Sequence, residues 1–196
     1  MPGMMETILN IGLTSKTIPS MIKISGDERF VYDSYRRLIM MYADVVMEKA
    51  LKLNRSTNPI RVLMEKELES VKKNRGYKND SNMKAGDWKV LSNKYLKMVK
   101  KEFGVPFPDD HYEQLYGAIA AVFESWNGKR AKEYRSFEKI SSSMGTAVNV
   151  QAMVFGNLGK NCGTGVAFTR NPSTGENVFF GEWLPTVSYT HLRAHE

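Results

Sequence analysis

The sequence is poor in cysteine and histidine. Its 196 residues contain one cysteine, Cys162, and three histidines, His111, His191 and His195. A single cysteine excludes an internal disulfide framework and fits a reducing compartment, from which we expect a cytoplasmic protein. We assign no role to Cys162 and interpret the histidines as surface or tail residues.

Long apolar runs and a secretory signal are also missing. No apolar run approaches the roughly 20 residues that a membrane-spanning helix needs. The first residues, MPGMMETILN, lack the basic flank and the small-residue cleavage site of a signal peptide. We therefore expect no membrane association. Hydrophobic residues make up 42% of the chain, enough for one domain with a buried core or for one domain and a smaller lobe.

Positive charge is unevenly distributed. The formal net charge is +7, and between Lys49 and Glu102 there are 15 Lys and Arg against 6 Asp and Glu. Such a region is a candidate for nucleic-acid binding. Basic runs such as 72–75 carry no interleaved aromatic residues that could stack on bases, so we expect solvated helix faces and no nucleic-acid partner.

Apolar residues recur at helical spacing through the first two thirds of the chain. In residues 28–48 the stripe contains Val31, Tyr35, Leu38 and Val45 and predicts one long helix that Asp27 caps. Similar patterns predict helices over about 15–24, 59–73, 88–103 and 110–126, followed by a basic segment at 129–137. Gly76 and Gly104 are the expected ends of two of them.

The period changes after residue 145. Ala147 to Phe155 alternates in polarity and predicts a strand, and Val166–Thr169 and Val178–Trp183 predict two more around a turn at 171–175. Helices followed by strands indicate an α+β fold. Three strands make a poor sheet alone, so we expect the chain to be a fragment, with further sheet before Met1 or after Leu184.

The segment GTGVAFTRNPSTGE, residues 163–176, combines glycines and hydroxyls without the GxxxxGK[ST] spacing of a P-loop. Glycines let a backbone approach phosphates closely, and hydroxyls donate hydrogen bonds without crowding. The same residues also suit a hairpin connection that holds no ligand. The segment alone does not decide between the two.

Four segments together resemble one family. They are MPGMMETILNIGL at 1–13, residues 29–47, residues 113–135, and GTAVNVQAMVFGN with GTGVAFTRNPSTGEN and GEWL between 145 and 184. In this order they closely resemble the nucleotide-binding domain of the pyruvate, phosphate dikinase family. The resemblance implies part of an ATP-grasp fold, with a phosphate-side loop at 1–13, a helical subdomain at 14–140 and a partial sheet at 145–184. Residues 185–196 resemble translated adaptor sequence, and we expect a non-native tail.

The resemblance implies a reaction of ATP, phosphate and pyruvate that gives AMP, pyrophosphate and phosphoenolpyruvate. ATP and Mg²⁺ are the implied cofactors. In the family a histidine on a swivelling domain carries the phosphoryl group to a pyruvate site on another domain, so pyruvate would meet the parent protein only outside this chain. We expect a homo-oligomeric parent and no catalysis by the fragment alone.

Five residues match positions that contact the nucleotide in the family. Thr164 and Gly165 match a phosphate-side loop, Gly3 a loop that approaches the same phosphates, Arg37 an arginine that positions the triphosphate, and Glu182 a carboxylate suited to Mg²⁺ or its waters. Without the resemblance, Arg37 is a helix-surface arginine paired with Asp33 or Asp44, and Glu182 is a strand-end acid. We assign no catalytic and no metal-ligating residue.

Some family features are absent from this sequence. Glu6 stands where the family has aspartate, and the family's lysine-bearing Gly-Lys-Gly segment and its Val-Arg-Ser-Gly segment do not occur. Two other interpretations stay open. One is a dikinase of the phosphoenolpyruvate synthase type, which uses water in place of phosphate, and the other is a basic helical module that binds nucleic acid or protein.

Overall fold

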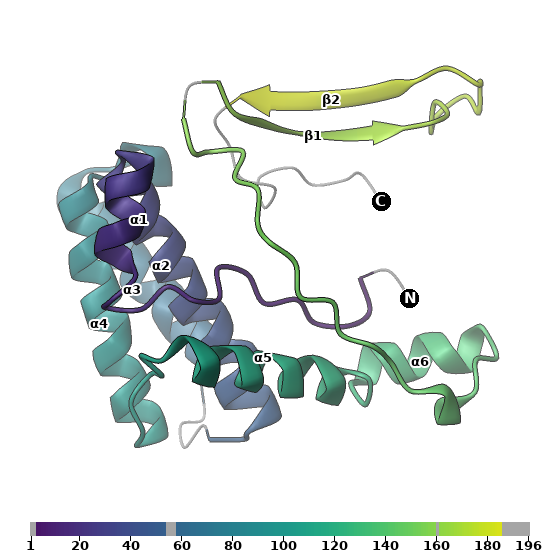
Figure 1. Cartoon of the computed structure of the whole chain (residues 1–196), viewed down its shortest axis with the longest axis horizontal. Coiled ribbons are helices and arrows are strands. Elements are labelled where there is room, and N and C mark those ends of the chain that lie inside the picture. The colour runs from purple at the N-terminus through teal and green to yellow at the C-terminus, as the bar shows by residue number, and fades with distance from the viewer. Residues whose placement is uncertain (1–2, 54–57, 160, 186–196) are drawn as a thin grey trace.

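A group of packed helices is followed by a separate β-hairpin (Figure 1). The computed structural model describes residues 3–53, 58–159 and 161–185. We call the helices together the helical body: α1 (Ile18–Ser25), α2 (Glu28–Tyr42), the π-helix η1 (Ala43–Ala50), α3 (Ile60–Arg75), the 3₁₀ turn η2 (Asp80–Asn82), α4 (Ala85–Phe103), α5 (His111–Ser125) and α6 (Lys129–Phe137). A further 3₁₀ turn, η3 (Ser142–Met144), follows, and then the strands β1 (Gly163–Phe168) and β2 (Phe180–Pro185).

The helices begin and end at the residues that cap them. Asp27 accepts a backbone N–H of the first turn of α2 at 2.9 Å, and Asp110 accepts two from the first turn of α5 at 2.9 and 3.0 Å. Gly76 and Gly104 follow α3 and α4 with positive φ values of 70° and 76°, which glycine adopts without strain. The predicted caps at Asp27, Gly76 and Gly104 are confirmed.

Two helix starts and one helix type differ from the prediction. α1 begins at Ile18 rather than near residue 15. α4 begins at Ala85, three residues earlier than predicted, and Asp87 lies inside its first turn, where it accepts the backbone N–H of Lys84 at 3.2 Å. The predicted helix over 28–48 is present, but from Ala43 it continues as a π-helix. Apolar spacing does not distinguish the two helix types, because both bury one face.

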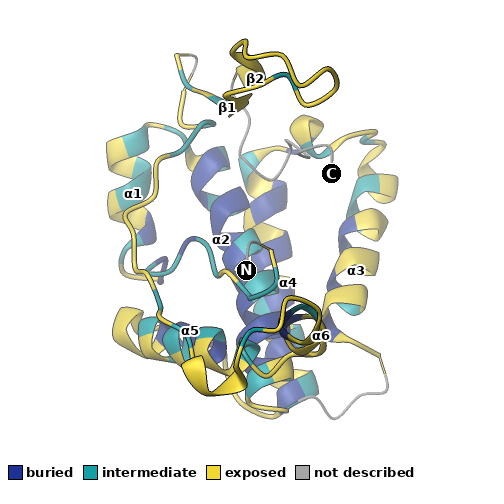
Figure 2. Ribbon diagram, turned by 90° about the vertical axis from the view of Figure 1, so that its right-hand side faces the viewer, coloured by how far each residue is buried: buried dark blue, intermediate teal, exposed yellow. Residues whose placement is uncertain are grey.

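The core lies where α2 crosses α4, with α3, α5 and η1 packed around them. Figure 2 shows the buried residues on the facing sides of these helices. The largest fully buried side chains include Trp88, Tyr95, Phe103, Leu38 and Ile39. Tyr95 donates its hydroxyl to the carbonyl oxygen of Met64 at 2.7 Å, which ties α4 to α3. Tertiary packing of these apolar stripes stabilises the helices, as predicted from their spacing.

A buried glutamine fixes the N-terminal segment on the helical body. Gln114 of α5 is fully buried, and its amide donates to the carbonyl oxygens of Leu13 at 3.1 Å and Pro108 at 2.9 Å. Its carbonyl accepts the N–H of Gly12 at 2.9 Å. A buried amide with these partners is satisfied and specifies one position of the segment that precedes α1.

The two strands form an antiparallel pair. Gly163 lies opposite Pro185, and Phe168 lies opposite Phe180. The connection turns at Asn171, whose carbonyl oxygen accepts the N–H of Gly175 at 2.8 Å, as the Asn-Pro-Ser-Thr-Gly pattern predicts. We call β1, β2 and this connection the hairpin. Pro185 belongs to β2, and the rest of the expected tail, 186–196, lies outside the described residues.

The strand predicted over 147–155 is wrong. These residues form no strand in the described structure and run as an extended trace from α6 toward β1 (Figure 1). An alternating sequence forms a strand only when a neighbouring strand accepts its hydrogen bonds, and none lies beside it among the described residues. Instead Phe155 packs edge-on against Phe30 of α2, with ring centroids 5.1 Å apart.

The fold is α+β, as predicted, with helices first and a two-stranded sheet after them. Over the described ranges, no helix combines the length and the apolar character that crossing a bilayer requires.

Candidate functional site

Three of the five predicted site residues lie on the hairpin. Thr164 and Gly165 belong to β1, and Glu182 belongs to β2 opposite Val166. Side chains alternate between the two faces of a strand, so Thr164 and Glu182 share one face as diagonal neighbours. The structure therefore brings the hydroxyl and the carboxylate together on one side of the hairpin.

Gly165 is required by the hairpin itself. A Cβ atom at this position would lie 2.9 Å from the carbonyl oxygen of Glu182 and 3.0 Å from Cβ of Trp183. Any side chain would therefore push β1 away from β2. Close approach of a phosphate and close approach of β2 both call for glycine here, so the glycine alone does not reveal a ligand.

Arg37 lies on α2 beside a second arginine, and Asp33 pairs with both. Asp33 Oδ1 lies 2.5 Å from Arg36 Nη2, and Asp33 Oδ2 lies 3.2 Å from Arg37 Nε. The Arg36 side chain is 4% exposed, with its guanidinium carbon 4.6 Å from the centre of the Trp88 ring, whereas the Arg37 side chain is 22% exposed. Arg36 is thus an inward-facing arginine, and Arg37 reaches the surface.

The charge of Asp33 is maintained by its neighbours. Burial alone would raise the pKa of this carboxyl. The guanidinium groups of Arg36 and Arg37 outweigh burial and hold the pKa of Asp33 below its usual range. Asp33 is therefore ionised at neutral pH, and the ion pairs are charge-assisted.

Gly3 lies in the N-terminal segment with a φ of 68°, a left-handed conformation that favours glycine. No neighbouring atom lies within 4 Å of the position that a Cβ would take, so crowding by the described residues does not require the glycine. The following residues Met4 and Glu6 line a pocket. The predicted phosphate-side loop thus reaches a hollow of the protein surface.

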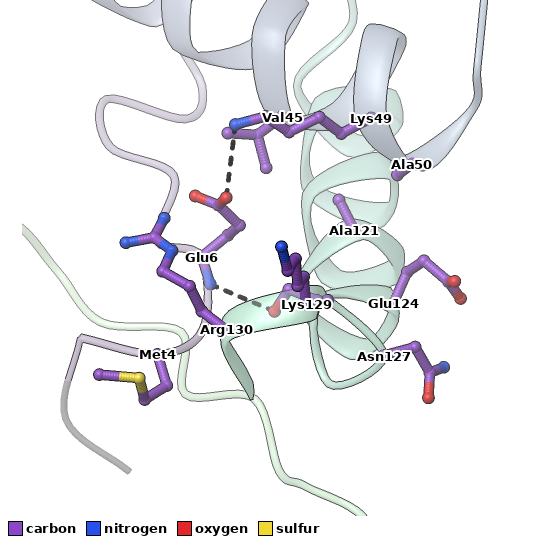
Figure 3. Close-up of a pocket in the computed structure, with 12 residues that line it drawn as sticks. Met4, Glu6, Val45, Lys49, Ala50, Ala121, Glu124, Asn127, Lys129 and Arg130 are labelled. Carbon is purple, nitrogen blue, oxygen red and sulfur yellow. Dashed lines mark hydrogen bonds and ion pairs between the residues drawn. The ribbon is translucent and has the colours of Figure 1, made fainter. Parts of the chain in front are cut away.

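This pocket has a volume of about 400 Å³ and lies between the N-terminal segment, η1, the end of α5 and the start of α6 (Figure 3). Five charged side chains are part of its wall: Glu6, Lys49, Glu124, Lys129 and Arg130. The rest of the wall is formed by Met4, Val45, Ala50, Ala121, Ser125, Asn127 and Gly128. None of the five predicted site residues is among them.

Polar contacts hold the pocket together. The backbone N–H of Glu6 donates to Ser125 Oγ at 3.2 Å, and Glu6 Oε1 lies 3.5 Å from Lys49 Nζ. Lys49 also pairs with the buried Asp44 at 3.2 Å. These contacts join the N-terminal segment to η1 and α5.

The start of α6 is electrostatically unusual. Gly128 caps the helix without a side-chain hydrogen bond, and the first helical residues are Lys129 and Arg130. Positive side chains are disfavoured at the positive end of a helix dipole. Sequence reasoning assigned these residues no role, although a Gly-Lys-Arg helix start was visible in the sequence.

A metal site is not evident in the described part of the chain. Within residues 3–53, 58–159 and 161–185, no three His, Cys, Asp or Glu side chains gather as metal ligands. Mg²⁺ often binds through one or two carboxylates together with substrate phosphates. Glu182 on the hairpin fits that limited role chemically, since it supplies one exposed carboxylate.

The predicted residues therefore occupy three places: the hairpin, the surface edge of α2 and the N-terminal segment. Sequence reasoning missed the pocket cations and the part that Asp33 plays as the shared partner of Arg36 and Arg37. The spacing Asp33-x-x-Arg36-Arg37 was the available signal, because residues three and four apart are neighbours on a helix. The resemblance named Arg37, with Asp33 or Asp44 as its possible partner, and the structure shows that Asp33 is a partner.

Comparison with known proteins identifies one family for the whole of this region. Residues 1–185 match the family described as pyruvate phosphate dikinase, AMP/ATP-binding domain. The chain is 47% identical to pyruvate, phosphate dikinase of Rhizobium meliloti over 184 residues, 94% of this chain and 19% of the relative. It is also 47% identical to pyruvate, phosphate dikinase 2 of Zea mays and to the enzyme of Clostridium symbiosum, each over 94% of this chain and 20% of the relative.

The chain thus spans about one fifth of the length of these relatives. The match includes the N-terminal segment, the helical body and the hairpin, and it ends at Pro185, the last residue of β2. The chain therefore belongs to the pyruvate phosphate dikinase AMP/ATP-binding domain family.

Proposed function

We propose that this chain is part of the ATP-binding domain of a dikinase that converts ATP, phosphate and pyruvate into AMP, pyrophosphate and phosphoenolpyruvate. The observation that carries the proposal is the match of residues 1–185 to one AMP/ATP-binding domain family. Phosphoryl transfer to pyruvate would proceed through a phosphohistidine on another domain of the parent protein. The chain itself supplies contacts to the nucleotide.

Within this proposal the hairpin and α2 bind the phosphates. The Thr164 hydroxyl and the backbone of Gly165 donate hydrogen bonds, and the Arg37 guanidinium supplies a planar fork of donors that suits phosphate oxygens. Gly3 lets the N-terminal segment approach the same anion. Glu182 would hold Mg²⁺ directly or through its waters, and the bound ion would neutralise charge on the phosphates.

The basic region of the helical body supports no second function. Several of its cations already pair with acids: Lys72 with Glu69 and Asp80, Lys94 with Glu67, and Arg75 with Asp87. Paired cations offer less charge to a phosphate backbone. We therefore propose no nucleic-acid partner. Cytoplasmic localisation and a homo-oligomeric parent remain predictions.

The test is phosphoenolpyruvate formation by the full-length protein that carries this segment. With ATP, phosphate and pyruvate present, we expect phosphoenolpyruvate, AMP and pyrophosphate in equal amounts. Omitting phosphate should stop the reaction. Turnover without added phosphate would instead identify a synthase that uses water, and absence of phosphoenolpyruvate under both conditions would refute the proposal.

Arg37→Ala in the same protein should lower kcat/KM for ATP by about 100-fold, because a fixed donor to the reacting phosphates is lost. Arg75→Ala is the matched control, since Arg75 also lies on a helix and pairs with one aspartate, at 3.3 Å. The control should stay within about twofold of wild type, because Arg75 is not among the residues predicted to contact the nucleotide. Equal effects of the two substitutions on kcat/KM would show that Arg37 does not bind the nucleotide phosphates.

A further inference from the structure

Asp33 of α2 is a buried carboxylate that pairs with two arginines of the same helix. It is 7% exposed, and its two carboxylate oxygens each face a different arginine. The arginines follow it by three and four residues, so all three side chains lie on one side of the helix. One buried carboxylate thus pairs with two guanidinium groups, one on a buried side chain and one on a partly exposed side chain.

Arg36 anchors this arrangement to the core. Its guanidinium lies over the fully buried Trp88 of α4 and within 4.0 Å of Asp80 Oδ2 in η2. Asp80 is itself paired with Lys72 of α3 at 3.1 Å. The side chain of Arg29 donates to the carbonyl oxygens of Met83 and Asp80 at 2.8 and 3.0 Å, which fixes η2 against α2. Four elements of the helical body therefore restrain the carboxylate of Asp33.

Arg37 is attached to this restrained carboxylate through its Nε atom. A hydrogen bond at Nε fixes the plane of the guanidinium group, and the Nη edge is the part that can grip two phosphate oxygens at once. A long arginine side chain that is already ordered loses less conformational entropy when it binds an anion. Restraint at Asp33 would therefore strengthen phosphate binding by Arg37.

The geometry points to Asp33 as the residue that positions Arg37 for the nucleotide phosphates. This inference rests on the proposed function, in which Arg37 binds the triphosphate. Asp33 itself touches no phosphate, because an ionised carboxylate would repel it; it acts through the orientation of Arg37. A purely structural Asp33, which only neutralises Arg36, is the competing explanation.

A double-mutant cycle separates the two explanations. In the full-length protein that carries this segment, the Kd of Mg-ATP is measured for wild type, Asp33→Asn, Arg37→Ala and the double variant. If Asp33 acts through Arg37, Asp33→Asn should raise the Kd by about tenfold, and it should add less than about twofold once Arg37 is alanine. A structural role predicts loss of stability in both backgrounds without this dependence on Arg37.

Asp87→Asn is the matched control. Asp87 is 9% exposed, lies in α4, pairs with Arg75 and accepts hydrogen bonds from Tyr77 and Lys84. It should lower stability and leave the Kd of Mg-ATP within about twofold of wild type. If Asp33→Asn fails to fold because Arg36 is left buried without a partner, Asp33→Asn with Arg36→Met removes both charges from the core and still releases Arg37.

The outcomes separate this inference from the proposed function. If Arg37→Ala weakens Mg-ATP binding while Asp33→Asn resembles Asp87→Asn, Asp33 does not position Arg37 and the proposed function is unaffected. If Arg37→Ala leaves the Kd unchanged, both the role of Arg37 and that of Asp33 are wrong. Phosphoenolpyruvate formation by the wild-type protein reports on the reaction in each case.

Discussion

The helical body and the hairpin differ in how much of their apolar surface is buried. Among the described residues, every buried hydrophobic side chain lies between Leu13 and Ala131, that is, within the helical body and the segment before it. The hairpin exposes large apolar side chains: Phe179 is 81% exposed and Trp183 is 69% exposed. One region has a core of its own, and the other presents apolar surface without one.

The difference follows from hydrogen bonding. A helix closes its backbone hydrogen bonds within one segment, so its apolar stripe needs only another helix to pack against. A strand depends on neighbouring strands for its backbone hydrogen bonds and on a second layer to cover its apolar face. The chain spans about one fifth of the length of the curated relatives it matches, and the further sheet expected from the sequence stays a prediction.

Two tryptophans provide the largest test of this comparison. Trp88→Ala removes a fully buried ring of α4 and the aromatic face against which Arg36 packs, and should lower the free energy of unfolding by about 3–5 kcal/mol. Trp183→Ala removes a ring of the same size from the exposed hairpin and should change the free energy of unfolding by less than about 0.5 kcal/mol. Urea unfolding of the two variants measures both values.

A loss at Trp183 as large as that at Trp88 would contradict the comparison. It would mean that in solution the hairpin is covered by other parts of the protein and contributes to the same core.

Much of the helical body could be predicted from sequence, because a helix closes its backbone hydrogen bonds within one segment. Local signals determine helix ends, and Asp27, Gly76 and Gly104 act where the sequence predicted them to act. The π-helical form of residues 43–50 could not be predicted, because it depends on packing rather than on residue type. The strand over 147–155 was wrong because alternation shows that a segment suits a sheet, not that a partner strand is present.

Two glycines within helices give a test of intermediate size. A Cβ at Gly117 in α5 would lie 2.1 Å from the hydroxyl oxygen of Tyr42, whose ring packs edge-on against Phe107 with centroids 5.4 Å apart. Gly117→Ala should therefore lower the free energy of unfolding by about 1–3 kcal/mol, despite the better helix propensity of alanine.

Gly86→Ala in α4 is its control, because no atom lies within 4 Å of the added Cβ. This substitution should raise the free energy of unfolding by about 0.5–1 kcal/mol. The two midpoints of thermal unfolding should thus move in opposite directions. Stabilisation by both alanines would show that α5 and the end of α2 are packed less closely than the structure indicates.

The residues of the candidate site lie partly on the helical body and partly on the hairpin. The residues of the helical body, Asp33 and Arg37, have partners and restraints that can be described atom by atom. The resemblance predicted one nucleotide site for all five residues, and the structure places Thr164, Gly165 and Glu182 on two paired strands. Local sequence patterns alone could not place the hairpin relative to Arg37, because that arrangement depends on contacts between regions far apart in the chain. The phosphate-binding roles of all five residues stay predictions.

The smallest expected effect on overall stability comes from Gly181 in β2. A Cβ there would lie 2.6 Å from the carbonyl oxygen of Val166, so Gly181→Ala should separate β2 from β1. Because the hairpin has little core of its own, the free energy of global unfolding should change by less than about 0.5 kcal/mol, while amide hydrogens of β1 exchange faster. Gly159→Ala, where no atom lies within 4 Å of the added Cβ, should change neither quantity. If Gly181→Ala instead destabilised the helical body, the two regions would unfold as one cooperative unit, and the exposed apolar face of the hairpin could not be regarded as independent of the core.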